Sequence, residues 1–240
     1  MTREITLQAT ELVVGYDRNK LALALPSLTV SGRCIALLGH NGSGKSTFLK
    51  TLLKLLTPSA GELRVTAHDA NGVHPLCPEQ DMAFCPEAGS VFLDVTVEEY
   101  LTFWCRIRLS NPRAYRSPEN QAVLDALGVS PHRKKLGREL SKGQRRRVHA
   151  AVGFVINPRL FLFDEPFDGL DIRHASALVG CIERARENSG FIISSHRIDI
   201  VERLCDAAIV LRDGGLITAG SLPEVTKALG GDTLSAGMIG

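Results

Sequence analysis

Residues 39–46, GHNGSGKS, have the types and spacing needed to hold a row of phosphates. The segment matches the pattern G-x-x-x-x-G-K-[ST] in full. Its glycines permit backbone conformations that point successive N–H groups inward, and the N-terminus of a following helix adds positive potential. Lys45 offers a cation to the β- and γ-phosphates, and Ser46 offers a hydroxyl to Mg²⁺. The alternative is a glycine-rich turn with a chance lysine. The apolar run before this phosphate loop and the helical pattern after it favour the phosphate site.

A second pair of reactive residues, Asp164 and Glu165, directly follows the apolar run LFLF at 160–163. A carboxylate at the end of such a strand can hold Mg²⁺ through water, so Asp164 is a candidate metal ligand. Glu165 is a candidate general base that polarises the attacking water. An ordinary acidic turn is the structural alternative. The two motifs together predict a P-loop NTPase, and they leave kinases, GTPases and helicases open.

The elements that must position these residues are short buried strands and helices. The runs CIALLG (34–39), LFLF (160–163) and FIIS (191–194) are continuous and apolar, which is typical of parallel strands covered on both faces. The phosphate loop leads into a predicted helix over 45–56, which Pro58 would stop. We therefore expect an α/β fold with a mostly parallel sheet.

The middle of the chain has a different pattern. From about residue 96 to 156 no segment is a convincing strand. Thr96 and Glu99 form a capping box that opens a helix, so this region is predicted to be a helical lobe inserted into the sheet domain. Further on, Asp213-Gly214-Gly215 between apolar runs predicts a hairpin. Ser221 and Glu224 then form a second capping box, and the last ten residues are small and polar enough to be loose.

The composition narrows the class of protein. The 240 residues are 44% hydrophobic with a net charge of +2, which disfavours disorder and binding of polyanions by overall charge. No stretch approaches the ~20 apolar residues of a membrane span, and the N-terminus is no signal peptide, so a cytosolic protein is expected. The cysteines lack any C-x-x-C pair, and we expect free buried thiols rather than zinc or disulfides at Cys34, Cys77, Cys85, Cys105, Cys181 and Cys205.

A third motif narrows the family. LSKGQ, residues 140–144, resembles the LSGGQ signature of ABC ATPases, and it lies about twenty residues before the Asp164 strand. DGLD at 168–171 and SSHR with His196 follow in the order typical of that family. The resemblance covers nearly the whole chain. It implies a P-loop NTPase (RecA-like) core with a mostly parallel sheet, an N-terminal antiparallel β-region and an inserted α-helical subdomain.

The resemblance also implies how the chain is divided. Residues 1–240 would form a single ABC ATPase domain. Its nucleotide-binding core would comprise 1–87 and 156–220. The helical lobe with the signature motif would span 88–155, and a C-terminal helix and tail would span 221–240.

The cofactors implied are ATP and Mg²⁺, and the family's roles fall on named positions. Lys45, Glu165 and His196 would be catalytic, with His196 donating a hydrogen bond to the γ-phosphate. Tyr16 would stack on adenine, although a plain surface tyrosine is the alternative. Mg²⁺ would be held by Ser46, Asp164 and Glu87. The nucleotide would be bound by Tyr16, Gly39, His40, Asn41, Gly42, Ser43, Gly44, Lys45, Ser46, Thr47, Glu87, Ser141, Gly143, Gln144 and Asp171.

The signature residues imply a shared site. Ser141 and Gly143 would begin a helix whose N-terminus acts on the ATP held by another subunit. Eight basic residues lie between Arg133 and Arg147, with only Glu139 opposing them. We interpret most of them as a solvated face of the helical lobe. No nucleic acid is expected, because aromatic residues are not interleaved with the basic ones.

The sequence departs from the family pattern at two positions. Glu87, after the strand MAFC, occupies the place of a usual glutamine, and Lys142 replaces the first signature glycine. A carboxylate at position 87 could still ligate Mg²⁺, but it would repel phosphates without the metal. The Lys142 motif and the Pro86-Glu87 pair resemble single-domain ATPase subunits of ABC-2-type transporters, many of them exporters.

The resemblance implies an ATP-hydrolysing subunit that powers transport, with export as the expected direction, through separate integral membrane permease subunits. Closure of a head-to-tail homodimer or ATPase heterodimer would be driven by ATP. The subunit would then be cytoplasmic, peripheral on the inner face of the membrane through the permease. The alternative is a non-transport ABC ATPase that acts in translation or on chromosomes. The sequence does not indicate the transported substrate.

Overall fold

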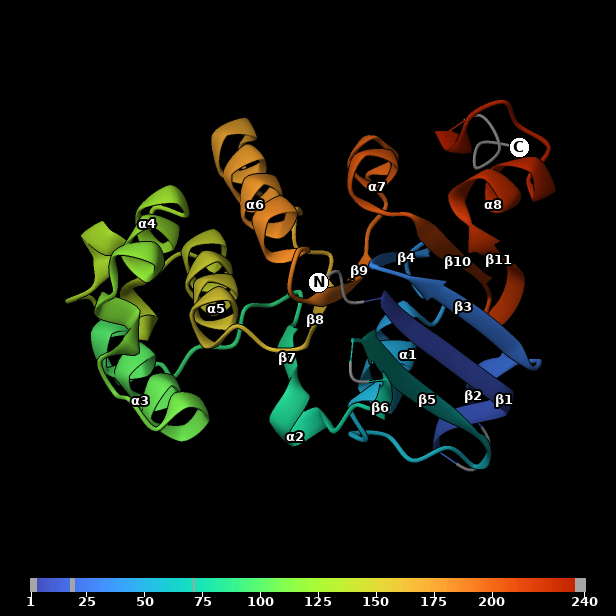
Figure 1. The fold of residues 1–240 in the computed structure, drawn as a ribbon, viewed down its shortest axis with the longest axis horizontal. Coiled ribbons are helices and arrows are strands. Elements are labelled where there is room, and N and C mark those ends of the chain that lie inside the picture. Colours follow the sequence, from blue (N-terminus) through green and yellow to red (C-terminus); the bar gives the residue numbers. More distant parts are fainter. Residues whose placement is uncertain (1–3, 18–19, 71, 236–240) are drawn as a thin grey trace.

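Residues 4–17, 20–70 and 72–235 are described by the computed structural model (Figure 1). The strands are β1 (Glu4–Asp17), β2 (Lys20–Leu25), β3 (Leu28–Gly32), β4 (Cys34–Leu38), β5 (Ala60–Asp69), β6 (Gly72–Pro75), β7 (Met82–Cys85), β8 (Leu160–Asp164), β9 (Gly190–Ser194), β10 (Ala207–Arg212) and β11 (Gly215–Ser221). The helices are α1 (Lys45–Leu52), α2 (Pro78–Asp81), α3 (Val97–Leu109), α4 (Pro118–Ala126), α5 (Lys142–Ile156), α6 (Ile172–Ala185), α7 (Ile198–Leu204) and α8 (Leu222–Ala228). Three short 3₁₀ helices, at Ala114–Arg116, Ser130–His132 and Gly137–Glu139, complete the middle region.

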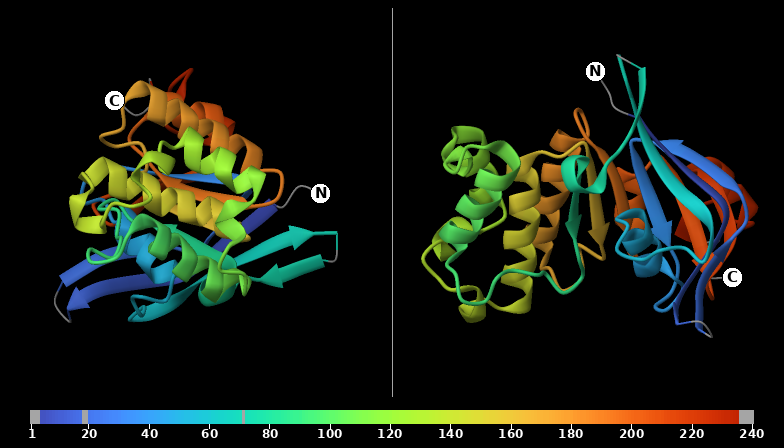
Figure 2. Two further views of the ribbon diagram at one scale, coloured as in Figure 1. Left: turned by 90° about the vertical axis from the view of Figure 1, so that its left-hand side faces the viewer. Right: turned by 90° about the horizontal axis from the view of Figure 1, so that it is seen from below.

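The predicted α/β fold is confirmed. The described strands form one curled sheet in the order β6-β5-β1-β2-β11-β10-β4-β9-β8-β7, and β3 pairs with β1. Strands β7, β8, β9, β4 and β10 are parallel to one another. Strand β1 pairs antiparallel with β2, β3 and β5, which is the expected N-terminal antiparallel region. The parallel strands lie between that region and helices α3, α4 and α5 (Figure 2).

Strand β4 shows why the continuous apolar runs became central strands. All five of its residues are fully buried. Cys34, Ala36 and Leu38 face one core cluster, which helices α3 to α8 complete. Ile35 and Leu37 face a second cluster, formed with α1 and the antiparallel strands. Side chains alternate along a strand, so a strand covered on both faces needs apolar residues at every position.

The middle of the chain is helical, as predicted. Residues 97–156 contain α3, α4, α5 and the 3₁₀ helices, and an isolated bridge joins Thr96 to Leu136. The Thr96–Glu99 capping box is present at the start of α3. We call the region of α3, α4 and α5 the helical lobe; in Figure 1 it lies at the opposite end of the molecule from β1 and β2.

The predicted helix over 45–56 is wrong at its C-terminal end. Helix α1 stops at Leu52, and Lys54 has a positive φ of 58°. The amide of Leu55 bonds back to the Lys50 carbonyl, so the chain turns before Pro58 is reached. The helix therefore ends in a left-handed turn of its own, a common helix C-terminus, and the proline is not needed to stop it.

Of the remaining local predictions, the hairpin and the second capping box are confirmed. Strands β10 and β11 form the predicted hairpin, with positive φ at Asp213 and Gly214. The Ser221–Glu224 capping box opens α8. All six cysteines are free, and five are buried. Within the described residues no helix combines the length and the apolar character that crossing a membrane requires. The prediction of a loose C-terminus is wrong for residues 231–235, because Leu234 is buried and its N–H donates to Glu202 Oε1 at 3.1 Å. Residues 236–240 lie outside the described part of the chain.

Candidate nucleotide-binding site

The phosphate loop joins the end of β4 to the start of α1. Gly39 and Gly44 have φ values of 148° and 104°. A Cβ at Gly39 would lie 2.4 Å from the Leu211 carbonyl oxygen, and one at Gly44 would lie 2.8 Å from Leu23. Helix α1 has no side-chain cap, so its first N–H groups remain available to an anion. The loop thus has the backbone shape that binding of phosphates requires.

Lys45 is the cation of this loop and is buried, with 6% of its surface exposed. Its ammonium donates to the carbonyl oxygens of Gly39 at 2.7 Å and His40 at 3.2 Å. It also forms an ion pair with Glu165 Oε1 at 3.3 Å. An ammonium has three protons, and three oxygens surround this one. Phosphate oxygens would therefore bind the Lys45 ammonium by replacing some of these three oxygens.

The two carboxylates at the end of β8 are held by a serine on the neighbouring strand. Asp164 and Ser194 are paired in the register of β8 and β9. Ser194 Oγ donates to Asp164 Oδ1 at 2.7 Å and accepts from the Glu165 backbone N–H at 2.8 Å. Glu165 adopts a positive φ of 47°, an uncommon conformation for a residue other than glycine. One buried hydroxyl therefore fixes the orientation of both acidic residues.

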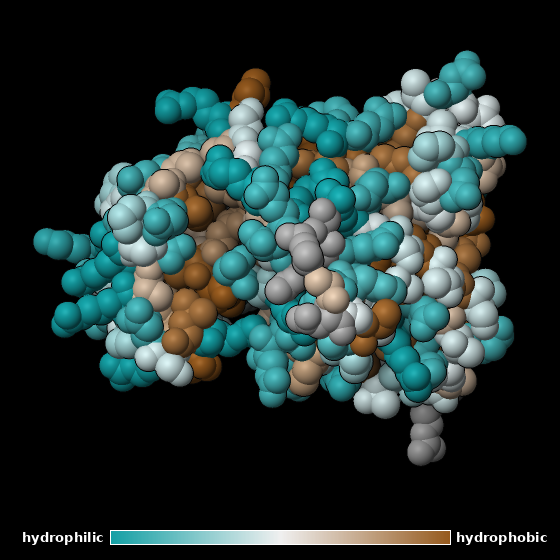
Figure 3. Space-filling model, in the orientation of Figure 1, coloured by the Kyte–Doolittle hydropathy of each residue, from teal (hydrophilic) through white to brown (hydrophobic). Residues whose placement is uncertain are grey.

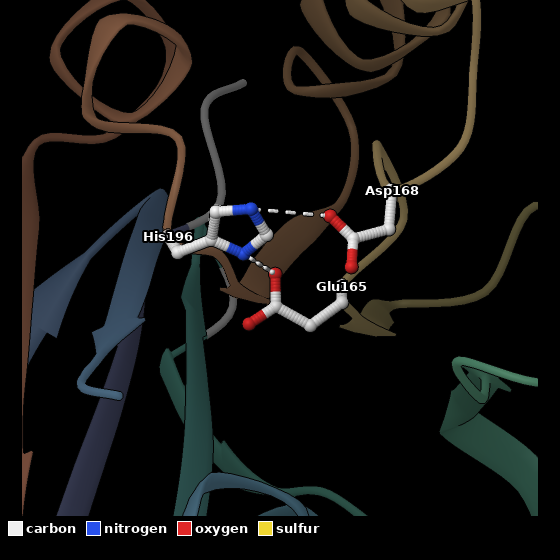
Figure 4. A group of neighbouring side chains, drawn as sticks. All are labelled: Glu165, Asp168 and His196. Atoms are coloured by element: carbon white, nitrogen blue, oxygen red, sulfur yellow. Dashed lines mark hydrogen bonds and ion pairs between the residues drawn. The ribbon is translucent and has the colours of Figure 1, made fainter. Parts of the chain in front are cut away.

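His196 follows β9 and lies beside Glu165. Its Nδ1 is 3.1 Å from Glu165 Oε2, and its Nε2 is 3.3 Å from Asp168 Oδ1 (Figure 4). Asp168 was not among the predicted site residues, although it belongs to the DGLD motif. A neutral imidazole donates from one nitrogen alone, and an imidazolium donates from both. The pair of carboxylates thus orients the ring between them.

The phosphate loop and the two carboxylates open onto one cleft of about 530 Å³, a size typical of ligand sites, whereas His196, Asp168 and Ser194 are not among its lining residues. Tyr16 is half exposed at its edge, and the Tyr16 hydroxyl lies 3.0 Å from Thr47 Oγ1. The cleft is lined by Tyr16, Leu21, Ala22, Asn41, Gly42, Gly44, Lys45, Ser46, Thr47, Glu87, Asp164, Glu165, Asp213 and Gly214. The sequence predicted most of the polar residues in this set. It did not predict that the β10–β11 hairpin contributes Asp213 and Gly214.

The same cleft suits Mg²⁺ and phosphate chemically. Ser46, Asp164 and Glu87 all line it, and they offer the oxygen ligands that Mg²⁺ prefers. The Ser43 hydroxyl is buried and has no hydrogen-bond partner among the described residues. A buried hydroxyl without a partner is costly unless a ligand supplies one. The residues present therefore fit a magnesium–phosphate ligand.

The signature residues lie elsewhere in the chain's own structure. Ser141 caps α5, and its hydroxyl accepts from the Gln144 N–H at 3.2 Å, while Gln144 Oε1 accepts from the Ser141 N–H at 2.9 Å. Gly143 approaches Gly169, from whose carbonyl oxygen an added Cβ would be 3.8 Å away. None of Ser141, Gly143 and Gln144 lines the cleft around Lys45. In Figure 1, α5 lies in the helical lobe, well apart from α1.

Asp171 also lies outside the cleft lining, at the start of α6. Its Oδ1 accepts from the His174 N–H at 3.0 Å, and Oδ2 lies 2.6 Å from His174 Nδ1. These contacts, the backbone N–H first, hold the pKa of the Asp171 carboxyl below its ordinary value. His40 is a rim residue of the phosphate loop, with its ring 3.4 Å from Asp213.

Arg146 is a further residue that the sequence did not single out. It belongs to the basic run, yet it is 97% buried, with 3% of its surface exposed. Its guanidinium donates to the backbone carbonyls of Glu87 and Asp168. Arg146 therefore joins the signature helix to two motif loops that are distant in the sequence. Other members of the run keep solvent-facing or local roles, such as the Arg138–Asp94 ion pair.

The comparisons with known proteins agree with this geometry. The family model described as "ABC transporter" matches residues 26–168. ABC transporter A family member 7 of Arabidopsis thaliana is 31% identical over 233 residues, which cover 90% of this chain and 24% of that protein. ATP-binding cassette sub-family A member 7 of Rattus norvegicus is 31% identical over 199 residues, covering 83% of this chain and 9% of that protein. The chain thus spans a quarter or less of these relatives.

Solved structures give the same fold. The "Structure of ATP binding subunit of ABC transporter" superposes with a TM-score of 0.83 at 25% identity, covering 97% of this chain and 98% of that one. The structure of cbiO1 from Clostridium perfringens, described as part of the ABC transporter complex cbiONQ, matches in fold, with a TM-score of 0.68 at 23% identity over 97% of both chains. The family model covers more than half of the chain, and this chain belongs to the ABC transporter family as an ATP-binding ATPase unit.

Proposed function

We propose that two copies of this chain, or this chain and a related ATPase, hold ATP between them head to tail. The observation that carries the proposal is the separation of Lys45 from Ser141 within one chain. The cleft supplies the phosphate loop and acidic residues. The N-terminus of α5, whose first turn contains no acidic residue, supplies a second site for an anion. Each chain would then contribute half of two sites, and ATP would supply the contacts that close the pair.

We propose a distinct role for each residue of a nucleotide site that two chains share. Lys45 binds the β- and γ-phosphates, and Glu165 polarises the attacking water. His196 donates a hydrogen bond to the γ-phosphate, while Asp168 acts as a positioning residue for its ring. Ser46, Asp164 and Glu87 would hold Mg²⁺, which neutralises charge on the phosphates when bound.

A dilution series of the wild-type chain tests this arrangement. If the site is shared, phosphate release per chain falls as the protein is diluted below the dissociation constant of the pair. The specific activity should recover when chains bearing an intact signature but the Lys45→Ala substitution are added. Constant specific activity at every dilution would show that one chain hydrolyses ATP alone.

We also propose that the pair powers transport through separate membrane subunits. An apolar groove of about 250 Å³ lies between the sheet and the helical lobe, lined by residues such as Phe84, Trp104 and His149. Figure 3 shows hydrophobic side chains gathered in a hollow on this face. The helical lobe also exposes Phe103 and Ile107 by 42% and 56%. Such a patch is typical of a docking site for a protein partner.

The apolar groove connects the proposed docking surface to the nucleotide cleft. Strand β7 contributes Phe84 and Cys85 to the groove and leads directly to Glu87 in the cleft. A membrane subunit pressed into the groove would therefore sense whether nucleotide is bound. We therefore propose that the protein lies at the inner face of the membrane, held there by its partner.

Co-purification from detergent extracts tests the docking surface. Ile107→Glu should abolish recovery of a polytopic membrane protein while leaving ATP binding intact. Val73→Glu is the matched control, because Val73 is 58% exposed on β6, away from the groove. Equal recovery with both variants would contradict the proposed surface.

The direction of transport rests on two residues. Lys142 and Glu87 resemble the pattern of ABC-2-type ATPase subunits, and we propose export on that basis. The competing function is non-transport work in translation or on chromosomes. Recovery of ribosomes or DNA in place of a membrane protein would favour that alternative.

A further inference from the structure

The two positions at which this chain departs from the family pattern touch each other. Lys142 Nζ lies 3.5 Å from Glu87 Oε1. Both side chains are more than half exposed, at 66% and 55%. The pair connects the loop after β7 with the first residue of α5, and so links the nucleotide cleft to the signature motif within one chain.

The main chain of this loop is fixed against α5. Arg146 donates to the Glu87 carbonyl oxygen from inside the structure. Gly89 has a φ of 62°, and a Cβ there would lie 2.7 Å from the Arg146 nitrogen and 2.8 Å from its Cα. No other residue type fits so close to the helix backbone. The loop cannot easily shift, so the Glu87 side chain is the part that can change partners.

Local electrostatics favours Lys142 as one partner. Lys142 is the first residue of α5, at the positive end of the helix, and the first turn contains no acidic residue. A cation at this end is unfavourable, and a nearby carboxylate offsets it. Glu87 also carries the sign of charge that this end of the helix favours, and the first turn of α5 has no acid of its own.

The nucleotide cleft offers Glu87 the other partner. Glu87 lines the cleft together with Ser46 and the buried carboxylate of Asp164. A second carboxylate turned toward Asp164 and the phosphates is repelled unless a cation lies between them. Mg²⁺ would provide that cation, because its ligands are oxygens such as these.

We propose that Lys142 is a positioning residue for Glu87: the two form an ion pair that opens when Glu87 turns to the Mg²⁺ of bound ATP. This inference rests on the proposed function. Opening the pair also frees Lys142 at the N-terminus of α5, where the γ-phosphate held by the opposite chain would lie. The departures at positions 87 and 142 are therefore one coupled change, in which each residue compensates for the charge of the other.

Hydrogen exchange without nucleotide tests whether the pair exists. We compare the wild type with Glu87→Gln, Lys142→Gln and the double variant, and follow the amides of residues 87–90. Each single change should speed exchange about two- to fivefold, the range expected for an exposed ion pair. The double variant should exchange no faster than the faster single variant, because the same interaction is lost. High salt should bring the wild type to the rate of the variants.

The matched control is the Arg138–Asp94 pair, which is also exposed but lies within the helical lobe. Arg138→Gln should leave the exchange of residues 87–90 unchanged. Additive effects of the two test substitutions, or an effect as large from Arg138→Gln, would overturn the ion pair.

A charge reversal separates the ion pair from nucleotide binding. Glu87→Lys combined with Lys142→Glu should restore slow exchange, because the charges attract again. The same variant should lose part of the increase in ATP affinity that Mg²⁺ gives the wild type, because Ser46 and Asp164 remain but a lysine at position 87 cannot ligate the metal. Retention of the whole increase would overturn the proposed exchange of partners. A wild-type chain that binds no ATP would instead refute the proposed function, while the exchange data would still decide whether the ion pair forms.

Discussion

Substitution of Ser194 by alanine tests how the acidic residues are positioned. The Ser194 hydroxyl is completely buried and bonds on both sides, to the Asp164 carboxylate and to the Glu165 N–H. Alanine removes both bonds without adding bulk. The Glu165 N–H is then left in a dry environment, and Asp164 loses its donor.

The magnitude follows from those two losses. A buried polar group left without a partner costs about 1–3 kcal/mol. We therefore expect the free energy of unfolding to fall by about 2–6 kcal/mol, a sum over the two groups. The positive φ of Glu165 makes its orientation dependent on this bond. Loss of such an outer contact to a metal ligand lowers activity about 10- to 100-fold, and we expect that decrease in kcat with little change in KM.

Steady-state phosphate release and urea unfolding, measured on the same samples, separate activity from stability. Ser189→Ala is the matched control, because Ser189 is equally buried and its hydroxyl donates to the Pro158 carbonyl at 2.6 Å. It should lose stability and keep its kcat. A Ser194→Ala protein with the kcat of Ser189→Ala would refute the positioning argument.

Three further outcomes are expected. Lys45→Ala should reduce phosphate release at least about 100-fold, since it removes a donor to the transferred phosphate, and near-normal turnover would contradict the site. In a mixture of Lys45→Ala and Ser141→Arg chains, each mixed pair should hold at most one working site. Activity should therefore reappear when the two inactive proteins are mixed, and continued inactivity at high concentration would contradict a site shared between chains. ATP affinity should depend more steeply on Mg²⁺ in the wild type than in Glu87→Gln, as measured by titration calorimetry; equal dependence would count against Glu87 as a ligand.

The sequence predicts the elements that follow from local pattern. The fully apolar runs became β4, β8 and β9, because strands covered on both faces need apolar side chains throughout. Capping boxes located the starts of α3 and α8. The end of α1 was missed, because the left-handed turn at Lys54 has no marker such as glycine.

The site was predictable where a motif is contiguous, as in the phosphate loop. Ser194 was not, because its bond to Asp164 depends on β8 and β9 being neighbours, and strand order is not written in either segment. Arg146 was grouped with a basic run on a helix surface, and burial alone distinguishes it. The Glu87–Lys142 contact joins positions 55 residues apart, so both departures could be seen in the sequence but their proximity could not.

The most direct test of the shared site is the mass of the Glu165→Gln variant in solution. Glutamine keeps the shape of the side chain and removes the proposed general base, so ATP should bind and persist. Light scattering coupled to size-exclusion chromatography should give the mass of two chains with MgATP and of one chain without it. A single-chain mass at every protein concentration, with ATP bound, would contradict the account.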